Sequence, residues 1–214
     1  HTTLFRTHMG VREGRVAGIE ARIFRVSFTG ELGYEVSVAT SYGLALWQAF
    51  LRVGENYDLT PIGTEALHIL RAEKGYIAVG QDTDGSVTPG DLGMDWAVSK
   101  SGDFIGKRSL ARADTTRAGR KQLVGLLTED AAYVLPEGAH IVAELKEPPP
   151  MEMLGHVTSS YMSPNLGRSI ALALLANGQA RLGERVTLSV DGGSVGAVVT
   201  EPVFLDPEGT RLNA

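Results

Sequence analysis

Two carboxylates at a glycine-rich bend are the residues whose types and spacing first suggest chemistry. Glu31 and Glu35 lie four residues apart in the stretch 25–36, which reads R-V-S-F-T-G-E-L-G-Y-E-V. Gly30 and Gly33 predict a sharp bend, because glycine tolerates backbone conformations that other residues avoid. A carboxylate held there can accept two parallel hydrogen bonds from a planar N–H pair, such as the 2-amino-4-oxo edge of a pterin. The alternative is a β-hairpin turn with ordinary surface acids, and the pattern by itself favours that alternative.

Arg71 is a further side chain that could contact a ligand, and Phe28 lies beside the bend. Arg71 lies near the end of a predicted helix over 60–73, in the run L-R-A-E-K-G. It is either a solvated or salt-bridged helix residue or a contact for an anionic substrate group, and both interpretations stay open.

The sequence lacks the residues that several other kinds of chemistry require. The chain has no cysteine, which removes disulfides, thiolate nucleophiles and Cys-ligated zinc. The run Q-D-T-D-G at 81–85 resembles an acidic calcium loop, but the bidentate Glu is missing and Pro89 interrupts the span, so we predict no metal site. No G-x-S-x-G, Walker or H-E-x-x-H motif occurs, and the glycines do not follow G-x-G-x-x-G, which excludes a Rossmann domain in this segment.

Composition narrows the class of protein further. The 214 residues are 43% hydrophobic and 21% charged, which is ordinary for a protein with a proper core. The net charge of −5, with both signs mixed along the chain, argues against a nucleic-acid surface. Apolar runs stay well short of the roughly 18 residues that span a bilayer, so we predict no membrane partner. The lack of cysteine is compatible with a reducing cytoplasm, which is the location we predict. The first residue is His1, which predicts a segment excised from a longer protein.

The first half of the chain predicts a small antiparallel sheet and two helices that position these residues. Alternating apolar and polar residues predict strands over 4–9, 16–28 and 34–38, with a turn at 12–15 and a bulge or turn at Gly18. Apolar residues at three- and four-residue spacing predict a helix over 41–56 with Trp47 in the core. A second helix over 60–73 is predicted to end at Gly75.

The second half predicts almost only β-structure. A strand is expected over 92–98 with Trp96 buried, and the polar run T-T-R-A-G-R-K at 114–120 predicts a linker. Beyond the linker, turn residues separate six short strands, predicted over 122–127, 139–144, 153–159, 169–175, 185–190 and 194–200. Six such strands indicate a small barrel or sandwich. The fold class is therefore α+β, with domains over 1–113 and 121–214.

Ordered motifs along the chain resemble the aminomethyltransferases of glycine cleavage, the T-protein family. The stretch 25–36 is very similar to that family's motif. The runs that follow it in order are L-R-A-E-K-G, V-G-Q-D-T-D, T-P-G-D-L-G-M-D-W-A-V, F-I-G-K-R-S-L, G-H-V-T-S and F-L-D-P-E-G. The resemblance spans residues 11–208. Residues 11–35 also look like the C-terminal part of the alpha subunit of heterotetrameric sarcosine oxidase, one branch of the family.

The resemblance implies a fold and a set of ligand contacts. Residues 1–113 would form partial folate-binding α/β lobes of a trilobed aminomethyltransferase fold, without its N-terminal part. A Greek-key or jelly-roll-like β-barrel would follow over 121–214. Glu35 matches the glutamate that binds the pterin edge, whereas Glu31 would shape the turn. Arg71 matches an arginine that contacts folate, and Phe28 replaces a tyrosine, so it can stack but cannot donate a hydrogen bond.

The resemblance also implies a function. The family's acid–base aspartate lies upstream of the matched region, so no catalytic residue is expected in this segment, and the segment alone is expected to be inactive. Within a sarcosine oxidase, it would bind tetrahydrofolate and accept the methylene group of oxidised sarcosine, giving 5,10-methylenetetrahydrofolate. The other subunits would be its partners, and FAD, FMN and NAD would bind elsewhere in the complex. The alternatives are a non-catalytic folate-binding or subunit-assembly module and a stand-alone aminomethyltransferase relative.

Overall fold

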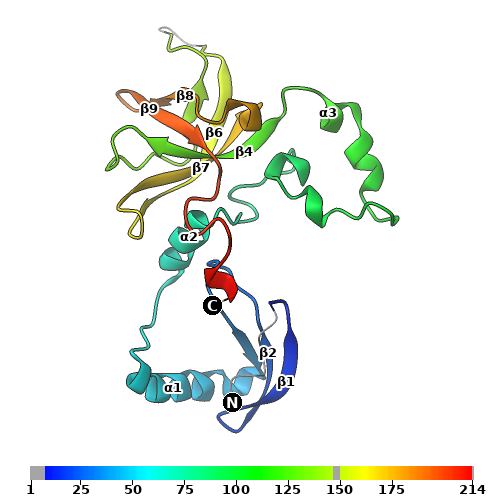
Figure 1. Cartoon of the computed structure of the whole chain (residues 1–214), viewed down its shortest axis with the longest axis vertical. Helices are drawn as coiled ribbons and strands as arrows, with labels where there is room; N and C mark the ends of the chain where they lie inside the picture. The colour runs from blue at the N-terminus through cyan, green and yellow to red at the C-terminus, as the bar shows by residue number, and fades with distance from the viewer. Residues whose placement is uncertain (1–7, 147–149, 214) are drawn as a thin grey trace. The chain divides into compact units, whose positions relative to one another are not determined.

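The chain folds into two compact units (Figure 1). A computed structural model describes residues 8–146 and 150–213. The first unit comprises residues 1–71 together with 206–214, and the second comprises residues 72–205. The last residues of the chain therefore belong to the same unit as the glycine-rich bend. The linker predicted at 114–120 stays a prediction about domain boundaries.

A three-stranded antiparallel sheet forms the base of the first unit. Its strands are β1 (Val11–Val16), β2 (Ile19–Phe24) and β3 (Glu35–Val38), in that order. Gly18 forms the predicted turn between β1 and β2, with φ of 80°. The turn predicted at 12–15 is wrong, because these residues lie within β1. Glu13 and Arg15 each pair with an oppositely charged residue of β2, which supports the extended strand there. Of the strand predicted over 4–9, residues 4–7 lie outside the described residues, and the remaining two form a turn.

The helix α1 (Gly43–Gly54) and most of the helix α2 (Thr64–Glu73) complete the described part of the first unit. A 3₁₀ turn (Thr40–Tyr42) leads into α1, and a second 3₁₀ turn (Glu55–Tyr57) follows it. The buried side of α1 carries Leu46 and Ala49, whereas Trp47 is 50% exposed, so the prediction of a core position for Trp47 is wrong. The helix α2 ends as predicted at Gly75, whose φ is 71° and whose N–H donates to the carbonyl of Ala72.

A closed six-stranded barrel forms the body of the second unit. Its strands are β4 (Lys121–Thr128), β5 (His140–Val142), β6 (Met153–Ser163), β7 (Arg168–Ala176), β8 (Arg185–Val190) and β9 (Gly193–Thr200). Around the barrel they follow the order β4-β7-β6-β5-β8-β9, in which β5, β6 and β7 are sequential neighbours and β4 returns beside β7, a Greek-key arrangement. The interior is apolar and fully buried, as at Leu126, Ile141 and Leu188. The prediction of a six-stranded C-terminal barrel is confirmed.

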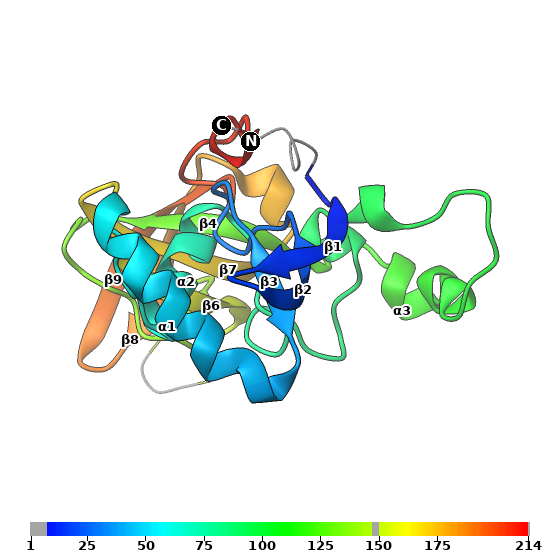
Figure 2. The same cartoon turned by 90° about the horizontal axis from the view of Figure 1, so that it is seen from below.

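The chain between α2 and β4 forms an irregular arm, and its part around the short helix α3 (Ala113–Thr116) extends away from the barrel in both views (Figures 1 and 2), whereas Val87 and Leu92 pack against the barrel. The arm also contains three 3₁₀ turns (Gly90–Leu92, Asp95–Ala97 and Lys107–Ala111). Further 3₁₀ turns lie at Gly178–Arg181 in this unit and at Arg211–Asn213 in the first. The strand predicted over 92–98 is wrong: Gly93 has φ of 70°, which ends regular structure, and Trp96 is 80% exposed. In the described part of the chain, every helix is too short or too polar to cross a membrane.

Candidate functional site

The glycine-rich bend joins β2 to β3 and folds tightly upon itself. Gly30 has φ of 78°, a conformation that side chains disfavour. A Cβ atom at Gly33 would lie 2.8 Å from the carbonyl oxygen of Val26, so the backbone itself approaches closely across the bend. These two glycines therefore allow the tight backbone path of the bend, which leads directly into β3.

Glu35 begins β3 and presents an exposed carboxylate. It lies opposite Phe24 in the β2–β3 register, so both side chains project from the same face of the sheet. Among the residues that the structure describes, Glu35 has no hydrogen-bond or ion-pair partner. Both carboxylate oxygens are therefore available to accept hydrogen bonds from a ligand.

Glu31 lies in a different environment from Glu35. One of its carboxylate oxygens accepts a hydrogen bond from Nη1 of Arg211 at 3.0 Å, and the two side chains form an ion pair. The arginine comes from the end of the chain, within the same unit. The two acids of the bend thus differ. Glu31 forms an ion pair with Arg211, whereas Glu35 has no such partner within the described residues.

Phe28 lies in the bend and contacts the helix α2. Its side chain is 44% exposed, which leaves part of the ring open to a ligand. The ring packs edge-on against His68, with the ring centroids 6.5 Å apart and the planes at 80°. Within the described residues, Nδ1 of His68 is buried and has no hydrogen-bond partner. A buried polar atom without a partner is costly, which makes this nitrogen a candidate ligand contact.

Arg71 lies one helical turn after His68 on α2, so the two side chains share a face of the helix. The residue is fully buried, with an exposed fraction of 0%. This burial argues against a solvated helix residue and leaves a charged group inside the protein. The structure thus links Phe28 to the face of α2 that carries Arg71, through His68, which the sequence alone indicates to be an ordinary packed or surface residue of the helix.

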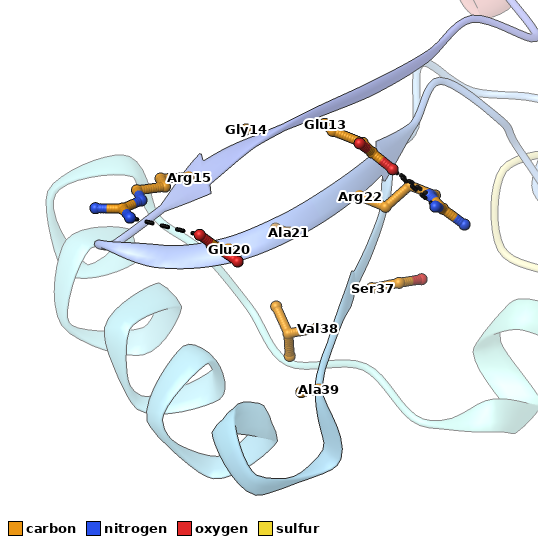
Figure 3. Close-up of a pocket in the computed structure, with 9 residues that line it drawn as sticks. All are labelled: Glu13, Gly14, Arg15, Glu20, Ala21, Arg22, Ser37, Val38 and Ala39. Atoms are coloured by element: carbon orange, nitrogen blue, oxygen red, sulfur yellow. Dashed lines mark hydrogen bonds and ion pairs between the residues drawn. The ribbon is translucent and has the colours of Figure 1, made fainter.

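A pocket of the first unit lies elsewhere on the sheet (Figure 3). It has a volume of about 600 Å³ and is lined by residues of β1, β2 and β3 and by Ala39, none of which is a predicted site residue. Two cross-strand ion pairs border it, Arg22 with Glu13 at 2.7 Å and Arg15 with Glu20 at 3.5 Å. Because the charges cancel in pairs, the pocket has no net electrostatic preference for an anion or a cation.

The buried acids of the second unit hold its loops to the barrel. Asp82 is fully buried and accepts hydrogen bonds from the hydroxyls of Thr158 and Ser159, both at 2.6 Å, and from the N–H of Ala78 at 2.8 Å. Glu73 accepts from the side chains of Ser163 and Asn165. These carboxylates are fully used within the protein. Over residues 8–146 and 150–213, no cluster of three or more His, Asp or Glu side chains is suited to a metal.

An ion pair fixes the arm of the second unit. Arg120 donates to both carboxylate oxygens of Asp91, at 2.9 and 2.5 Å, and to the carbonyl of Ser86 at 2.6 Å. Burial alone would raise the pKa of Asp91, but hydrogen bonds from Arg120 and Thr88 outweigh it and hold the pKa below its ordinary value. The arrangement is structural, because every oxygen of Asp91 already has a partner.

Comparisons with known proteins agree along almost the whole chain. Residues 5–102 match the family model described as the GCVT N-terminal domain, and residues 121–206 match the glycine cleavage T-protein C-terminal barrel domain. The chain is 52% identical to the sarcosine oxidase subunit alpha of Corynebacterium sp. (strain P-1) over 91% of its own length. It is 31% identical to an aminomethyltransferase of Thermotoga petrophila over 90% of its length.

The same relatives are longer than this chain. It spans 20% of the Corynebacterium subunit and 51% of the Thermotoga enzyme. The fold is shared with the crystal structure of the glycine cleavage system aminomethyltransferase T from Bartonella henselae, with a TM-score of 0.78 and 22% identity. That comparison covers 94% of this chain and 53% of the other.

Proposed function

Because the chain belongs to the glycine-cleavage T-protein family, we propose that its first unit binds tetrahydrofolate through Glu35, Phe28 and Arg71. In this proposal the residues 1–113 form the folate-binding lobes, 114–120 the linker and 121–214 the barrel domain. The observation that carries it is the contrast between the two acids of the bend. Glu31 is engaged by Arg211, whereas Glu35 presents a carboxylate without a protein partner in the described residues.

The chemistry of these groups fits a reduced pterin. The carboxylate of Glu35 accepts two parallel hydrogen bonds from the amino and ring N–H groups of the pterin edge. The half-exposed ring of Phe28 packs on the flat heterocycle, and the unpartnered Nδ1 of His68 gains a hydrogen bond. Arg71 places a positive charge beside the folate, where a guanidinium can contact an aromatic ring or a carbonyl.

We further propose that the segment works within a sarcosine oxidase, with the other subunits of that complex as partners. There it takes up the methylene group released when sarcosine is oxidised, while FAD, FMN and NAD bind outside this chain. Tetrahydrofolate, when bound, supplies the nucleophilic nitrogens that accept the one-carbon unit. The residues of this chain hold the folate in place and exclude water, which would otherwise hydrolyse the oxidised amine to formaldehyde. The acid–base group of the family is proposed to lie outside this chain.

The test is a Glu35→Gln variant of the intact protein. Gln keeps the size of the side chain but replaces one acceptor with a donor and removes the charge, so one of the two paired hydrogen bonds is lost. Tetrahydrofolate affinity is expected to fall by about 10- to 100-fold, corresponding to roughly 1.5–3 kcal/mol for a hydrogen bond to a charged group. Oxidation of sarcosine in the complex should persist. Unchanged folate affinity would overturn the site.

A second candidate function is an assembly module without folate chemistry. The apolar residues Leu44, Trp47 and Val53 of α1 are half or more exposed, which is a surface that another protein segment could cover. The two functions separate in one assay of the intact complex. Folate-dependent trapping of the one-carbon unit supports the transfer role, whereas equal release of formaldehyde with and without tetrahydrofolate supports the assembly role.

A further inference from the structure

We propose that the last residues of the chain, 206–213, position the glycine-rich bend for folate, with Arg25 and Arg211 as the positioning residues. This inference rests on the proposed folate site and extends it, because neither arginine is among the expected ligand contacts. Residues 206–213 and the bend belong to the same compact unit. We call residues 206–213 the tail.

Arg25 lies at the start of the bend and is 1% exposed. Its Nη2 donates to the carbonyl of Leu212 in the tail at 2.6 Å. Its Nη1 reaches the carbonyl of Gly33 at 3.5 Å, a longer and weaker contact. The guanidinium carbon also lies 5.4 Å from the centroid of the Tyr34 ring, within range of a cation–π interaction. One buried cation therefore contacts the tail and both residues that immediately precede Glu35.

Asp206 gives the tail a defined shape. The residue has φ of 49°, and its carboxylate accepts hydrogen bonds from the N–H of Thr210 at 2.9 Å and of Arg211 at 3.1 Å. The hydroxyl of Thr210 donates to the same carboxylate at 2.5 Å. This closed turn directs the tail into the 3₁₀ turn at Arg211–Asn213, which carries the carbonyl that Arg25 binds. The D-P-E-G run, which begins at Asp206, thus forms the turn that shapes the tail in this chain.

Arg211 fastens the other side of the bend. Its guanidinium pairs with Glu31 at 3.0 Å, with both side chains a little under half exposed. The tail therefore contacts the bend at two points, at Glu31 through Arg211 and at Arg25 through the carbonyl of Leu212. Two attachments restrict the bend more than one, because a single contact still allows rotation about it. The predicted consequence is a Glu35 carboxylate held in a fixed orientation before the ligand arrives, which lowers the entropy cost of binding.

The test reverses the exposed ion pair in the full chain. Arg211→Glu places two carboxylates together, and Glu31→Arg places two guanidiniums together, so each change pushes the tail away from the bend. Tetrahydrofolate affinity, measured by equilibrium titration, is expected to fall about fivefold in each single variant, the size of one exposed ion pair. The double variant Glu31→Arg/Arg211→Glu restores the pair with its polarity reversed and should recover most of the affinity. Because a purely structural pair would give the same rescue, urea unfolding is recorded for each variant, and a fall in affinity without a matching fall in stability identifies a positioning role.

The matched control is the exposed ion pair of the barrel between Arg185 and Glu129, whose side chains are 70% and 47% exposed. The double variant Glu129→Arg/Arg185→Glu and its singles should leave folate affinity unchanged. Single variants at 31 and 211 with wild-type affinity would overturn the proposal, and so would a double variant that fails to recover. If Glu35→Gln also binds normally, the folate site itself fails, and the two failures are thereby distinguished.

Arg25 provides a second, larger effect. Arg25→Lys keeps the charge but loses the planar fork that reaches Leu212 and Gly33 together. Tetrahydrofolate affinity is expected to fall roughly tenfold, with the midpoint of urea unfolding recorded in parallel. A variant that folds and binds folate normally would contradict the role of Arg25. If Arg25→Lys does not fold, the charge reversal at 31 and 211 decides the proposal.

Discussion

The barrel and the first unit are built on different principles. The barrel surrounds a continuous apolar interior in which residues such as Leu126 and Leu188 are completely buried. In the described part of the first unit, the buried apolar residues are only Ala21, Leu46 and Ala49, each still 6–8% exposed, and several large ones on α1 are exposed. The shape of the barrel follows from its own core, whereas the shape of the first unit depends on polar contacts such as those of Arg25. The less self-contained unit carries the candidate ligand contacts.

A pair of leucine truncations should show the largest difference between the two units. Leu126→Ala removes a fully buried side chain from the barrel and leaves a cavity, so the free energy of unfolding should fall by about 2–5 kcal/mol. Leu44→Ala in α1 removes a side chain that is 69% exposed and should cost less than about 1 kcal/mol. Urea unfolding of both variants measures the contrast. Equal losses of unfolding free energy in the two variants would contradict the contrast between the buried apolar interior of the barrel and the exposed apolar residues of α1.

A pair of carboxylate deletions tests the polar contacts in the same way. Asp82→Ala removes the carboxylate that accepts from the buried hydroxyls of Thr158 and Ser159 and leaves Thr158 only the carbonyl of Leu172 at 3.2 Å, so the expected loss is roughly 2–4 kcal/mol. Glu13→Ala removes an exposed carboxylate that pairs with Arg22 and should cost under about 1 kcal/mol. Thermal unfolding of the two variants compares them. An Asp82→Ala variant as stable as Glu13→Ala would show that this buried cluster does not fasten the loop.

A smaller effect is expected from pH, and it should arise in the barrel. Burial lowers the pKa of His156, the positive charge of Lys121 lowers it further, Asp84 opposes the shift, and His140, opposite on β5, adds to it. The unfolded chain therefore takes up the proton at a higher pH than the folded one, near the ordinary pKa of about 6.5. The stabilising contribution of neutral His156 is complete above that pH and is lost as the pH falls through the lower folded-state pKa.

The measurement is urea unfolding between pH 7.5 and pH 5. The slope of stability against pH in that window should shrink in His156→Gln and, to a lesser extent, in Lys121→Gln, because removing the lysine charge restores part of the ordinary pKa. A slope that stays the same in His156→Gln would assign the pH dependence to other groups.

The barrel could be predicted from the sequence because its signals are local. Six alternating or fully apolar runs separated by turn residues place the strands within a few residues of their bounds, and Asp191–Gly192 closes the β8–β9 hairpin as expected. The errors occur where local pattern and environment disagree. Trp47 has the spacing of a core residue, yet the buried side of α1 is narrow and carries small or medium side chains.

The candidate site was predictable only in part, for a related reason. Glu35 lies in a recognisable motif. The different roles predicted for Glu35 and Glu31 rest on the resemblance to a family. The contacts of Arg25 and Arg211 join residues about 180 positions apart, and no local period reports such a pairing. His68 has the same limitation, because its role depends on the ring of Phe28, which lies 40 residues earlier in the chain.

Hydrogen–deuterium exchange of the intact protein with and without tetrahydrofolate tests the central claim most directly. Saturating ligand should slow exchange in residues 25–38, in α2 and in the tail, while exchange in the β4–β9 barrel strands should stay the same. Protection confined to the barrel, or the absence of any protection at saturating tetrahydrofolate, would contradict the assignment of the folate site to the first unit.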